Sequence, residues 1–323
     1  MITVPTRKYP VYSVSFWKAY FIQMRPYLLF ISGIAGLAGM AISKTEQVEW
    51  WRVLIAFIPF FFGYGFGQAL TDCFQTDTDK LSAPYRPLSQ GIVSINSVFT
   101  VSIVGLFCCA IILYWMHFMS FILSCISVFG LATYSYIKRN FWFGGPFYNA
   151  WIVALLTIMG YFALSAPETR TFPIHLLPYV FVSFFSYASF VLIGYLKDID
   201  ADKVTNYKTF PVVWGWNSSI LLGDVFALAS IFFIWFQPLN NAFAIVAATI
   251  ASLIILYGQI VGHTAKNKNE RGALIPILST VRSFIFFHIA IVLHFQQSWW
   301  LYMIIYYILF ELFLLKRPSR YQV

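Results

Sequence analysis

Long apolar runs separated by short polar connections dominate the chain. We searched for stretches of roughly 20 predominantly apolar residues, the length that crosses the hydrocarbon core of a bilayer. The predicted membrane-spanning segments are residues 26–43, 51–71, 96–115, 118–137, 147–165, 176–196, 214–236, 241–262, 273–294 and 298–315. This pattern predicts an all-α fold, a polytopic bundle of transmembrane helices. Because the connections are short, we expect a single membrane domain over residues 1–323, with no soluble module.

The distribution of Lys and Arg predicts how the helices are oriented. Cytoplasmic loops of membrane proteins carry an excess of these residues. If the N-terminus is cytoplasmic and the segments alternate, most of the 21 basic residues fall on the inner side. Lys44, Arg52 and Arg170 fall on the outer side, and Arg282 lies within a helix. We therefore expect an integral, multi-pass membrane protein with its N-terminus in the cytoplasm.

Composition excludes several other classes of protein. Of the 323 residues, 60% are apolar and 10% are charged, against roughly 45–50% and about 25% in soluble proteins. These values exclude a soluble enzyme, a disordered chain and a small domain held by disulfides. The net charge of +9 by itself suggests a polyanion partner, but the inner-side bias of the basic residues accounts for it. We expect a lipid bilayer as partner and no nucleic acid.

The acidic residues are few, and many of them are clustered. The chain has only 12 Asp and Glu. The two clusters are Asp72, Asp77 and Asp79, and Asp198, Asp200 and Asp202. Each cluster follows the inner end of a long apolar run, so both are expected on the cytoplasmic side. Ionisable groups so close to a membrane are costly and are usually functional.

Helical periodicity sorts these carboxylates. If each cluster continues its helix, at about 100° per residue, Asp72 and Asp79 share one face, and so do Asp198 and Asp202. The middle aspartate of each cluster then points away. Two facing pairs offer the hard oxygen ligands that suit Mg²⁺ shared with substrate phosphates. A solvated helix end is the usual explanation for a single Asp, but two matching clusters on one side favour a metal site.

Basic residues lie close to the same loops. They are Arg86, Lys138, Arg139, Lys197 and Lys208. A divalent metal and surrounding cations together neutralise the charge of a departing pyrophosphate. The two loops therefore favour a site for Mg²⁺ and a diphosphate.

At these residues the chain resembles the UbiA superfamily of intramembrane prenyltransferases. The family's first motif, Asn-Asp-x-x-Asp-x-x-x-Asp, corresponds to residues 71–79, and a Pro-x-Arg-Pro segment follows at residues 84–87. The second motif, Asp-x-x-x-Asp, corresponds to residues 198–202, and its Thr-x-Pro-Val segment to residues 209–212. Residues 134–139, Tyr-Ser-Tyr-Ile-Lys-Arg, resemble the family's basic loop.

The resemblance covers residues 16–294 and implies a fold and a reaction. Nine helices surround a central cavity, and the tenth run, 298–315, is expected at the periphery. An isoprenyl diphosphate binds between the two Asp motifs, bridged by Mg²⁺, and its prenyl group passes to a hydrophobic acceptor, which is an aromatic ring, a tetrapyrrole alcohol or a lipid alcohol. The implied catalytic and metal-binding residues are Asp72, Asp79, Asp198 and Asp202. The implied diphosphate-binding residues are Arg86, Lys138, Arg139, Lys197, Lys208, Gln75 and Thr71.

Two departures from the first motif leave other functions open. Thr71 stands where the family has Asn, and Gln75 where it has the middle Asp, so we expect weaker metal binding there. One alternative is a UbiA-type class I terpene cyclase, which ionises the same kind of diphosphate and cyclises it without an acceptor. A second alternative is a non-enzymatic transporter, although that function predicts acids near the membrane midplane.

Two further charges lie inside predicted helices. Asp224 and Arg282 are each about ten residues into their runs, where an unpaired charge is costly. We expect them to pair with each other. The alternative is that one of them lines the cavity and contacts the substrate.

Overall fold

The fold is that of a computed structural model, which describes residues 8–43 and 49–318. The long helices are α3 (Trp50–Asp72), α5 (Ile95–Met116), α6 (Phe118–Asn140), α7 (Gly144–Leu164), α8 (Leu177–Gly194), α10 (Phe210–Trp235), α11 (Ala242–Thr264), α12 (Glu270–Phe295) and α13 (Trp300–Leu315). The shorter ones are α1 (Val14–Gln23), η1 (Pro26–Leu28), α2 (Leu29–Ile42), α4 (Thr76–Ser82), η2 (Ile174–Leu176), η3 (Tyr195–Asp198), α9 (Ile199–Val204) and η4 (Gln297–Trp299).

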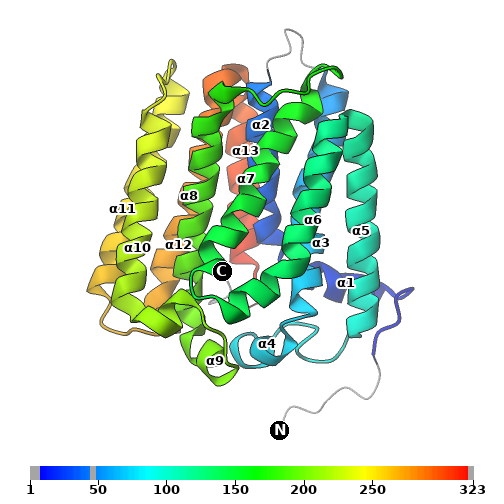
Figure 1. The fold of residues 1–323 in the computed structure, drawn as a ribbon, viewed down its shortest axis with the longest axis vertical. Helices are drawn as coiled ribbons and strands as arrows, with labels where there is room; N and C mark the ends of the chain where they lie inside the picture. Colours follow the sequence, from blue (N-terminus) through cyan, green and yellow to red (C-terminus); the bar gives the residue numbers. More distant parts are fainter. Residues whose placement is uncertain (1–7, 44–48, 319–323) are drawn as a thin grey trace.

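The helices stand side by side as an upright bundle (Figure 1). Within the described part of the chain, nine helical segments are long and apolar enough to cross a membrane. The pair Val14–Gln23 and Pro26–Ile42, bent by 53°, makes a tenth if it is counted as one span. Each of the ten predicted apolar runs is confirmed as helix, with ends that differ by a few residues. Of the residues used to orient the bundle, Arg7, Lys44 and Arg320 lie outside the described residues.

Helix α2 lies at the centre of the bundle. All 14 of its residues are buried, and it packs against α3, α7 and α12. Glycines let its backbone touch that of α7, because a Cβ atom at Gly39 would lie 2.0 Å from the carbonyl oxygen of Thr157. A Cβ atom at Gly160 would lie 2.1 Å from the carbonyl oxygen of Gly36. Small residues at such contacts are typical of helices that pack inside membranes.

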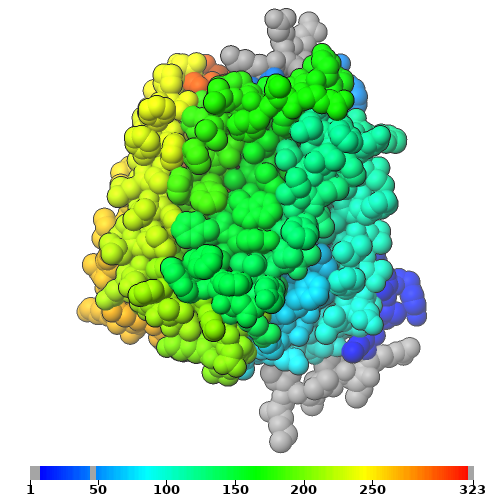
Figure 2. All heavy atoms as spheres, viewed as in Figure 1, coloured from blue at the N-terminus to red at the C-terminus, as the bar shows by residue number. Residues whose placement is uncertain are grey.

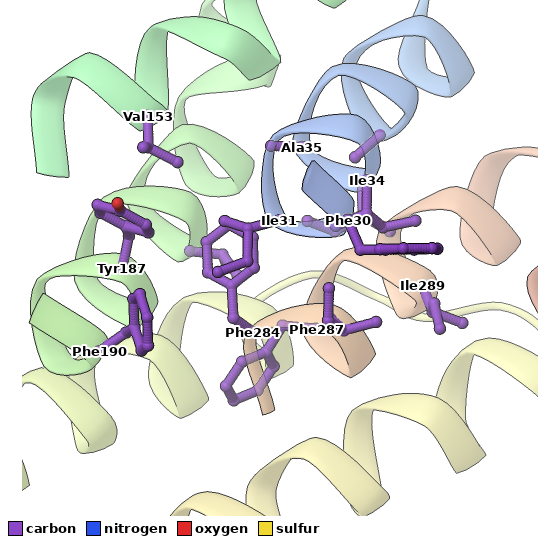
Figure 3. Packing of buried hydrophobic residues seen from close by; sticks show 14 of the residues in the cluster. Phe30, Ile31, Ile34, Ala35, Val153, Tyr187, Phe190, Phe284, Phe287 and Ile289 are labelled. Atoms are coloured by element: carbon purple, nitrogen blue, oxygen red, sulfur yellow. The ribbon is translucent and has the colours of Figure 1, made fainter. Parts of the chain in front are cut away.

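Large apolar side chains fill the space around α2. Figure 3 shows Ile31 of α2 close to Phe284 of α12 and to Tyr187 and Phe190 of α8. The rings of Tyr187 and Phe284 meet edge to face, with their centroids 5.8 Å apart. In the space-filling view of Figure 2, the green helices α6, α7 and α8 cover the middle of one face. The core therefore joins α2, near the N-terminus, to α8 and α12 in the second half of the sequence.

A buried hydrogen-bonded chain links three helices near the middle of the bundle. The hydroxyls of Thr157 and Ser183 lie 2.8 Å apart, and the Ser183 hydroxyl lies 2.8 Å from His288 Nε2. His288 Nδ1 lies 2.8 Å from the Phe284 carbonyl, which fixes the proton on Nδ1. Every member is thus satisfied, as buried polar groups must be. The three residues hold α7, α8 and α12 in register.

The two charges inside the helices do not pair with each other, so that prediction is wrong. Arg282 instead forms a two-pronged ion pair with Glu311 of α13, with Nε–Oε1 and Nη2–Oε2 distances of 2.7 and 2.9 Å. Tyr307 also donates to Glu311, at 2.7 Å. Asp224 lies 2.7 Å from His263 on the neighbouring helix α11. Glu311 lies on the tenth predicted run. The depth of a charge along its own run does not reveal which helices pack against it, and it is the packing of α13 on α12 that gives Arg282 its partner.

Candidate active site

The first Asp motif spans a helix break. Helix α3 ends at Asp72 and α4 begins at Thr76, and Gln75 between them has a non-helical backbone, with φ −122° and ψ 21°. The prediction that Asp72 and Asp79 share a face of one continuous helix is therefore wrong. Arg86 nevertheless brings them together, because its Nη1 lies 3.6 Å from Asp72 Oδ1 and 2.6 Å from Asp79 Oδ2.

The second Asp motif is broken in the same way. Asp198 ends η3 with φ −103° and ψ 5°, and Asp202 lies in the following helix α9, so these two are not on one regular helix either. Lys197 donates to Asp198 at 3.0 Å. The fully buried Asp202 accepts from Thr209 Oγ1 at 3.1 Å and lies 3.7 Å from Lys138 Nζ. The Thr-x-Pro-Val segment thus holds the last carboxylate of the motif.

The short helices α4 and α9 bring the two motifs to the same end of the bundle. Figure 1 shows both at the lower end of the molecule, and the hydroxyls of Thr78 and Thr205 join them at 2.8 Å. Gln75 donates from Nε2 to the Ser135 hydroxyl of α6, at 2.9 Å. That bond links the break in the first motif to α6.

Arg25 belongs to this site, although in the sequence it is only one of the many basic residues on the predicted inner side. It lies at the bend between α1 and η1, with φ +54°, and its Nη2 donates to Asp72 Oδ1 at 2.7 Å. Gln23 and Gln68 also donate to Asp72, at 2.6 and 3.2 Å. An Arg before Pro26 at the start of the first apolar run was a visible signal, but basic residues are expected at any inner helix end.

A cavity opens between these groups. Its charged walls are Arg25, Asp72, Asp79, Arg86, Lys138, Lys197 and Asp198. Amides and phenols complete the polar lining, from Gln68, Gln75, Asn149, Tyr27, Tyr64, Tyr134, Tyr187 and Tyr195. The cavity therefore contains seven of the eleven residues that the sequence analysis selected, together with a set of tyrosines that it did not.

The other four selected residues lie around the cavity, outside its lining. Asp202 lies behind Lys138, and Thr71 donates to the carbonyl of Gln68 at 2.9 Å. Each therefore contacts a residue of the cavity lining, Lys138 or Gln68, without lining the cavity itself.

Arg139 and Lys208 lie further out. Arg139 pairs with Asp77, a half-exposed partner, and its guanidinium lies 4.5 Å from the centre of the Tyr207 ring. The side chain of Lys208 is exposed, and its backbone N–H donates to the Arg139 carbonyl at 3.0 Å. Both residues lie outside the lining of the cavity.

The carboxylates and guanidinium groups of the first motif are electrostatically coupled. Burial raises the pKa of the Asp79 carboxyl; Arg86 opposes this rise and the nearby Asp72 carboxylate adds to it. Burial alone would lower the pKa of Arg86, but Asp79 and Asp72 outweigh it and the pKa is raised. Arg86 therefore remains a cation in the cavity wall.

The donor set fits a divalent cation that is shared with a phosphate. In residues 8–43 and 49–318, no three His, Cys, Asp or Glu side chains converge on one point. Each motif supplies a pair of carboxylates, and Asp202 Oδ1 is buried without a hydrogen-bond donor. Mg²⁺ is commonly held by one or two carboxylates and completed by substrate phosphates and water. The arrangement matches that mode of binding and does not match a closed metal cage.

Comparison with known proteins gives the family. The profile of the UbiA prenyltransferase family matches residues 32–287. The chain belongs to the UbiA prenyltransferase family. It is accordingly an integral membrane prenyltransferase, as the resemblance of its motifs implied.

Curated relatives of this UbiA family member include archaeal enzymes. The digeranylgeranylglyceryl phosphate synthase of Thermococcus sibiricus is 26% identical over 227 residues, covering 66% of this chain and 75% of the relative. The synthase of the same name from Thermococcus onnurineus is 25% identical over 263 residues, covering 74% and 85%.

Solved structures show the same UbiA fold. A UbiA homologue from Aeropyrum pernix superposes with a TM-score of 0.69 over 79% of this chain and 94% of the homologue, at 17% identity. A homologue from Archaeoglobus fulgidus, bound to DMAPP and Mg²⁺, superposes with a TM-score of 0.61 over 83% and 98%, at 16% identity. At such identities the likeness establishes the fold alone.

Proposed function

We propose that this UbiA family member transfers the prenyl group of an isoprenyl diphosphate to a hydrophobic acceptor, with Mg²⁺ as cofactor. The observation that carries the proposal is a cavity lined by three carboxylates, Asp72, Asp79 and Asp198, together with four cations, and backed by the buried Asp202 behind Lys138. The family membership supports it, and so do the Archaeoglobus fulgidus homologues described with DMAPP or GPP and Mg²⁺.

The proposed roles follow from where each side chain lies. Mg²⁺ and the diphosphate would be held between the metal-binding and catalytic residues Asp72, Asp79, Asp198 and Asp202. Direct diphosphate ligands would be Arg25, Arg86, Lys138, Lys197 and Gln75. Thr71, Arg139 and Lys208 would support these residues from outside the cavity lining.

The chemistry is the departure of a charged leaving group. When bound, Mg²⁺ supplies neutralisation of the negative charge that grows on the diphosphate. The allylic C–O bond breaks and its electron pair leaves with the diphosphate oxygen. Arg86 and Lys138 stabilise that charge from fixed positions, at no cost of reorganisation. The acceptor then attacks the prenyl carbon and releases a proton.

Two tyrosines in the cavity wall are suited to the prenyl cation, which is the other product of that bond cleavage. Tyr64 and Tyr187 are joined through their hydroxyls at 2.8 Å, which fixes both rings. The faces of aromatic rings attract cations. Fixed rings next to the leaving-group site would therefore shield a prenyl cation until the acceptor captures it.

The proposal is tested with the purified full-length protein in detergent. It is incubated with Mg²⁺, prenyl diphosphates of ten to twenty carbons and a panel of acceptors, and the products are identified by mass spectrometry. Geranylgeranylglyceryl phosphate is the first acceptor to use, because the relatives are named for the digeranylgeranyl product. We expect a prenylated acceptor that disappears in the double variant Asp198→Ala, Asp202→Ala and persists in Asp200→Ala.

Other results would lead elsewhere. A cyclic hydrocarbon or alcohol formed without any acceptor would identify a terpene cyclase and replace the transfer reaction. Absence of both turnover and Mg²⁺-dependent diphosphate binding would show that the changes at Thr71 and Gln75 have disabled the site, and the proposal would be wrong.

A further inference from the structure

The bend between α1 and α2 forms part of the wall of the polar cavity. Arg25, Tyr27 and Leu28 line the cavity, and the helices on either side of the bend meet at 53°. Pro26 has no N–H with which to continue the helical hydrogen bonds across the bend. The shape of the bend therefore depends on contacts from other parts of the molecule.

Helix α13 contacts both arms of this bend. The centroid of the Phe313 ring lies 6.5 Å from that of Phe21 on α1 and 5.6 Å from that of Phe30 on α2. Phe30 also meets the rings of Tyr306 and Phe310, with centroids 5.1 and 5.9 Å away. Phe313 thus rests against both arms from a single position on α13.

The contact between α13 and the start of α2 is closely packed. Tyr306 donates to the Phe30 carbonyl at 2.7 Å. A Cβ atom at Gly33 would lie 2.7 Å from the Tyr306 hydroxyl, so the glycine leaves the space that this hydroxyl occupies. Phe310 is fully buried in the same contact. The start of α2 is therefore fixed against α13, although most residues of α13 face outward.

The comparison with the family sets these parts of the chain apart. The family profile matches residues 32–287, so it includes neither Arg25 nor α13. Two segments from opposite ends of the chain, both outside the matched region, thus meet at the wall of the polar cavity. The contact is a feature of this chain that the family profile does not describe.

We propose that α13 holds this bend in shape and that Phe313 is a positioning residue for Arg25. The inference rests on the proposed function, because it treats Arg25 as a ligand of the diphosphate. Arg25 has a φ of +54°, a strained conformation for a residue with a Cβ. When the bend relaxes, its guanidinium moves away from Asp72, to which it donates at 2.7 Å. The Phe313 ring prevents this by bracing both arms.

The experiment measures, by calorimetry, the dissociation constant of a prenyl diphosphate with Mg²⁺ and without acceptor, on the full-length protein in detergent. The probe is whichever compound of ten to twenty carbons the wild type binds most tightly. In Phe313→Ala we expect binding to weaken by about three- to tenfold, because a misplaced guanidinium loses charge-assisted hydrogen bonding. Phe313→Tyr keeps the ring and should bind as the wild type does.

A double-mutant cycle tests whether Phe313 acts through Arg25. In the Arg25→Gln background, Phe313→Ala should weaken binding by less than about twofold, since the charge that Phe313 positions is already absent. Equal weakening in the two backgrounds would overturn the inference. So would an unchanged affinity in Phe313→Ala alone.

Two further variants of α13 separate positioning from stability. Ile308→Ala shortens an exposed side chain and should leave the affinity unchanged. Met303 is buried ten residues before Phe313, about 15 Å along the helix. Met303→Ala should lower the melting temperature without weakening binding. If it weakens binding as much as Phe313→Ala does, α13 acts through stability alone and the inference is wrong. Failure of the wild type to bind any of the compounds would instead overturn the proposed function.

Discussion

Arg25 is held in a conformation that few residues other than glycine adopt. Its φ of +54° costs a residue with a Cβ roughly 1–2 kcal/mol. The ion pair to Asp72 offsets this cost, because both side chains are nearly buried and the Arg donates at 2.7 Å. Backbone strain of this kind gathers at functional sites. It positions the guanidinium at the cavity, although in the sequence Arg25 is one of many basic residues at a predicted inner helix end.

Replacement of Arg25 by Gln tests its role as a diphosphate ligand. The variant keeps a polar side chain of similar length but removes the positive charge. We expect binding of a prenyl diphosphate to weaken by about tenfold or more, the effect of losing one charge-assisted hydrogen bond, as measured by calorimetry. Arg52→Gln, at the end of α3 opposite the Asp motif and beside Glu49, is the matched control. Equal affinities in the two variants would remove Arg25 from the site.

Thr209 is predicted to act as a positioning residue for Asp202. In Thr209→Val the shape is kept but the hydroxyl that donates at 3.1 Å is lost. We expect turnover to fall about 10–100-fold, the usual loss when a residue that orients a metal ligand is changed, with a higher Mg²⁺ requirement. Thr209→Ser keeps the hydroxyl and should restore both. If Ser fails to restore activity while Val and Ser variants fold equally well, the hydroxyl has no such role.

At the scale of elements, helix breaks create the site. Both Asp motifs lie where a long helix gives way to a short one, and the aspartates of α4 and α9 fall in first helical turns. There the positive end of the helix dipole favours a carboxylate. Apolar length predicted the long helices well, since any run of about 20 residues must span the bilayer. The helix breaks within the two Asp motifs could not be predicted from the periodicity of such short polar segments. They depend on tertiary contacts, such as the ion pair between Arg86 and Asp79.

The ion pair between α12 and α13 should be important for stability. Glu311→Gln leaves Arg282 without its counter-charge, and we expect a lower free energy of unfolding by about 1–3 kcal/mol, seen as a lower melting temperature in detergent. The double variant Arg282→Gln, Glu311→Gln should recover part of that loss. Asp224→Asn, whose partner His263 is about half exposed, should change it little. A double variant less stable than either single one would contradict this account.

On the scale of the whole molecule, the family model covers most of the bundle and leaves α13 beyond its end. The sequence could place this helix at the periphery, where only Met303, Phe310 and Leu314 of its residues are buried. It could not show that α13 reaches the central helix, where Tyr306 donates to the Phe30 carbonyl at 2.7 Å. Such contacts join residues hundreds of positions apart and depend on the complete packing.

Orientation in the membrane is a further prediction for the whole molecule. The bias of Lys and Arg predicts that both Asp motifs face the cytoplasm. Single cysteines at Lys203, in α9, and at Arg170, at the other end of the bundle, are introduced after the native cysteines are replaced. An impermeant thiol reagent should label the first in inside-out vesicles and the second in right-side-out vesicles. The reverse pattern would invert the topology.

The apolar cavity between α3, α5, α6 and α7, which shares Tyr64 and Asn149 with the polar one, competes with the bilayer for any hydrocarbon chain, whereas a cavity in a soluble protein competes with water. Lipid tails are as apolar as its walls, so a hydrocarbon chain gains little free energy by partitioning from one to the other. For the proposed prenyl diphosphate, affinity then comes from the charged head, and apolar walls can only exclude chains that do not fit. The concentration that governs occupancy is therefore the mole fraction of ligand in the lipid, and adding inert lipid at constant bulk concentration empties the site.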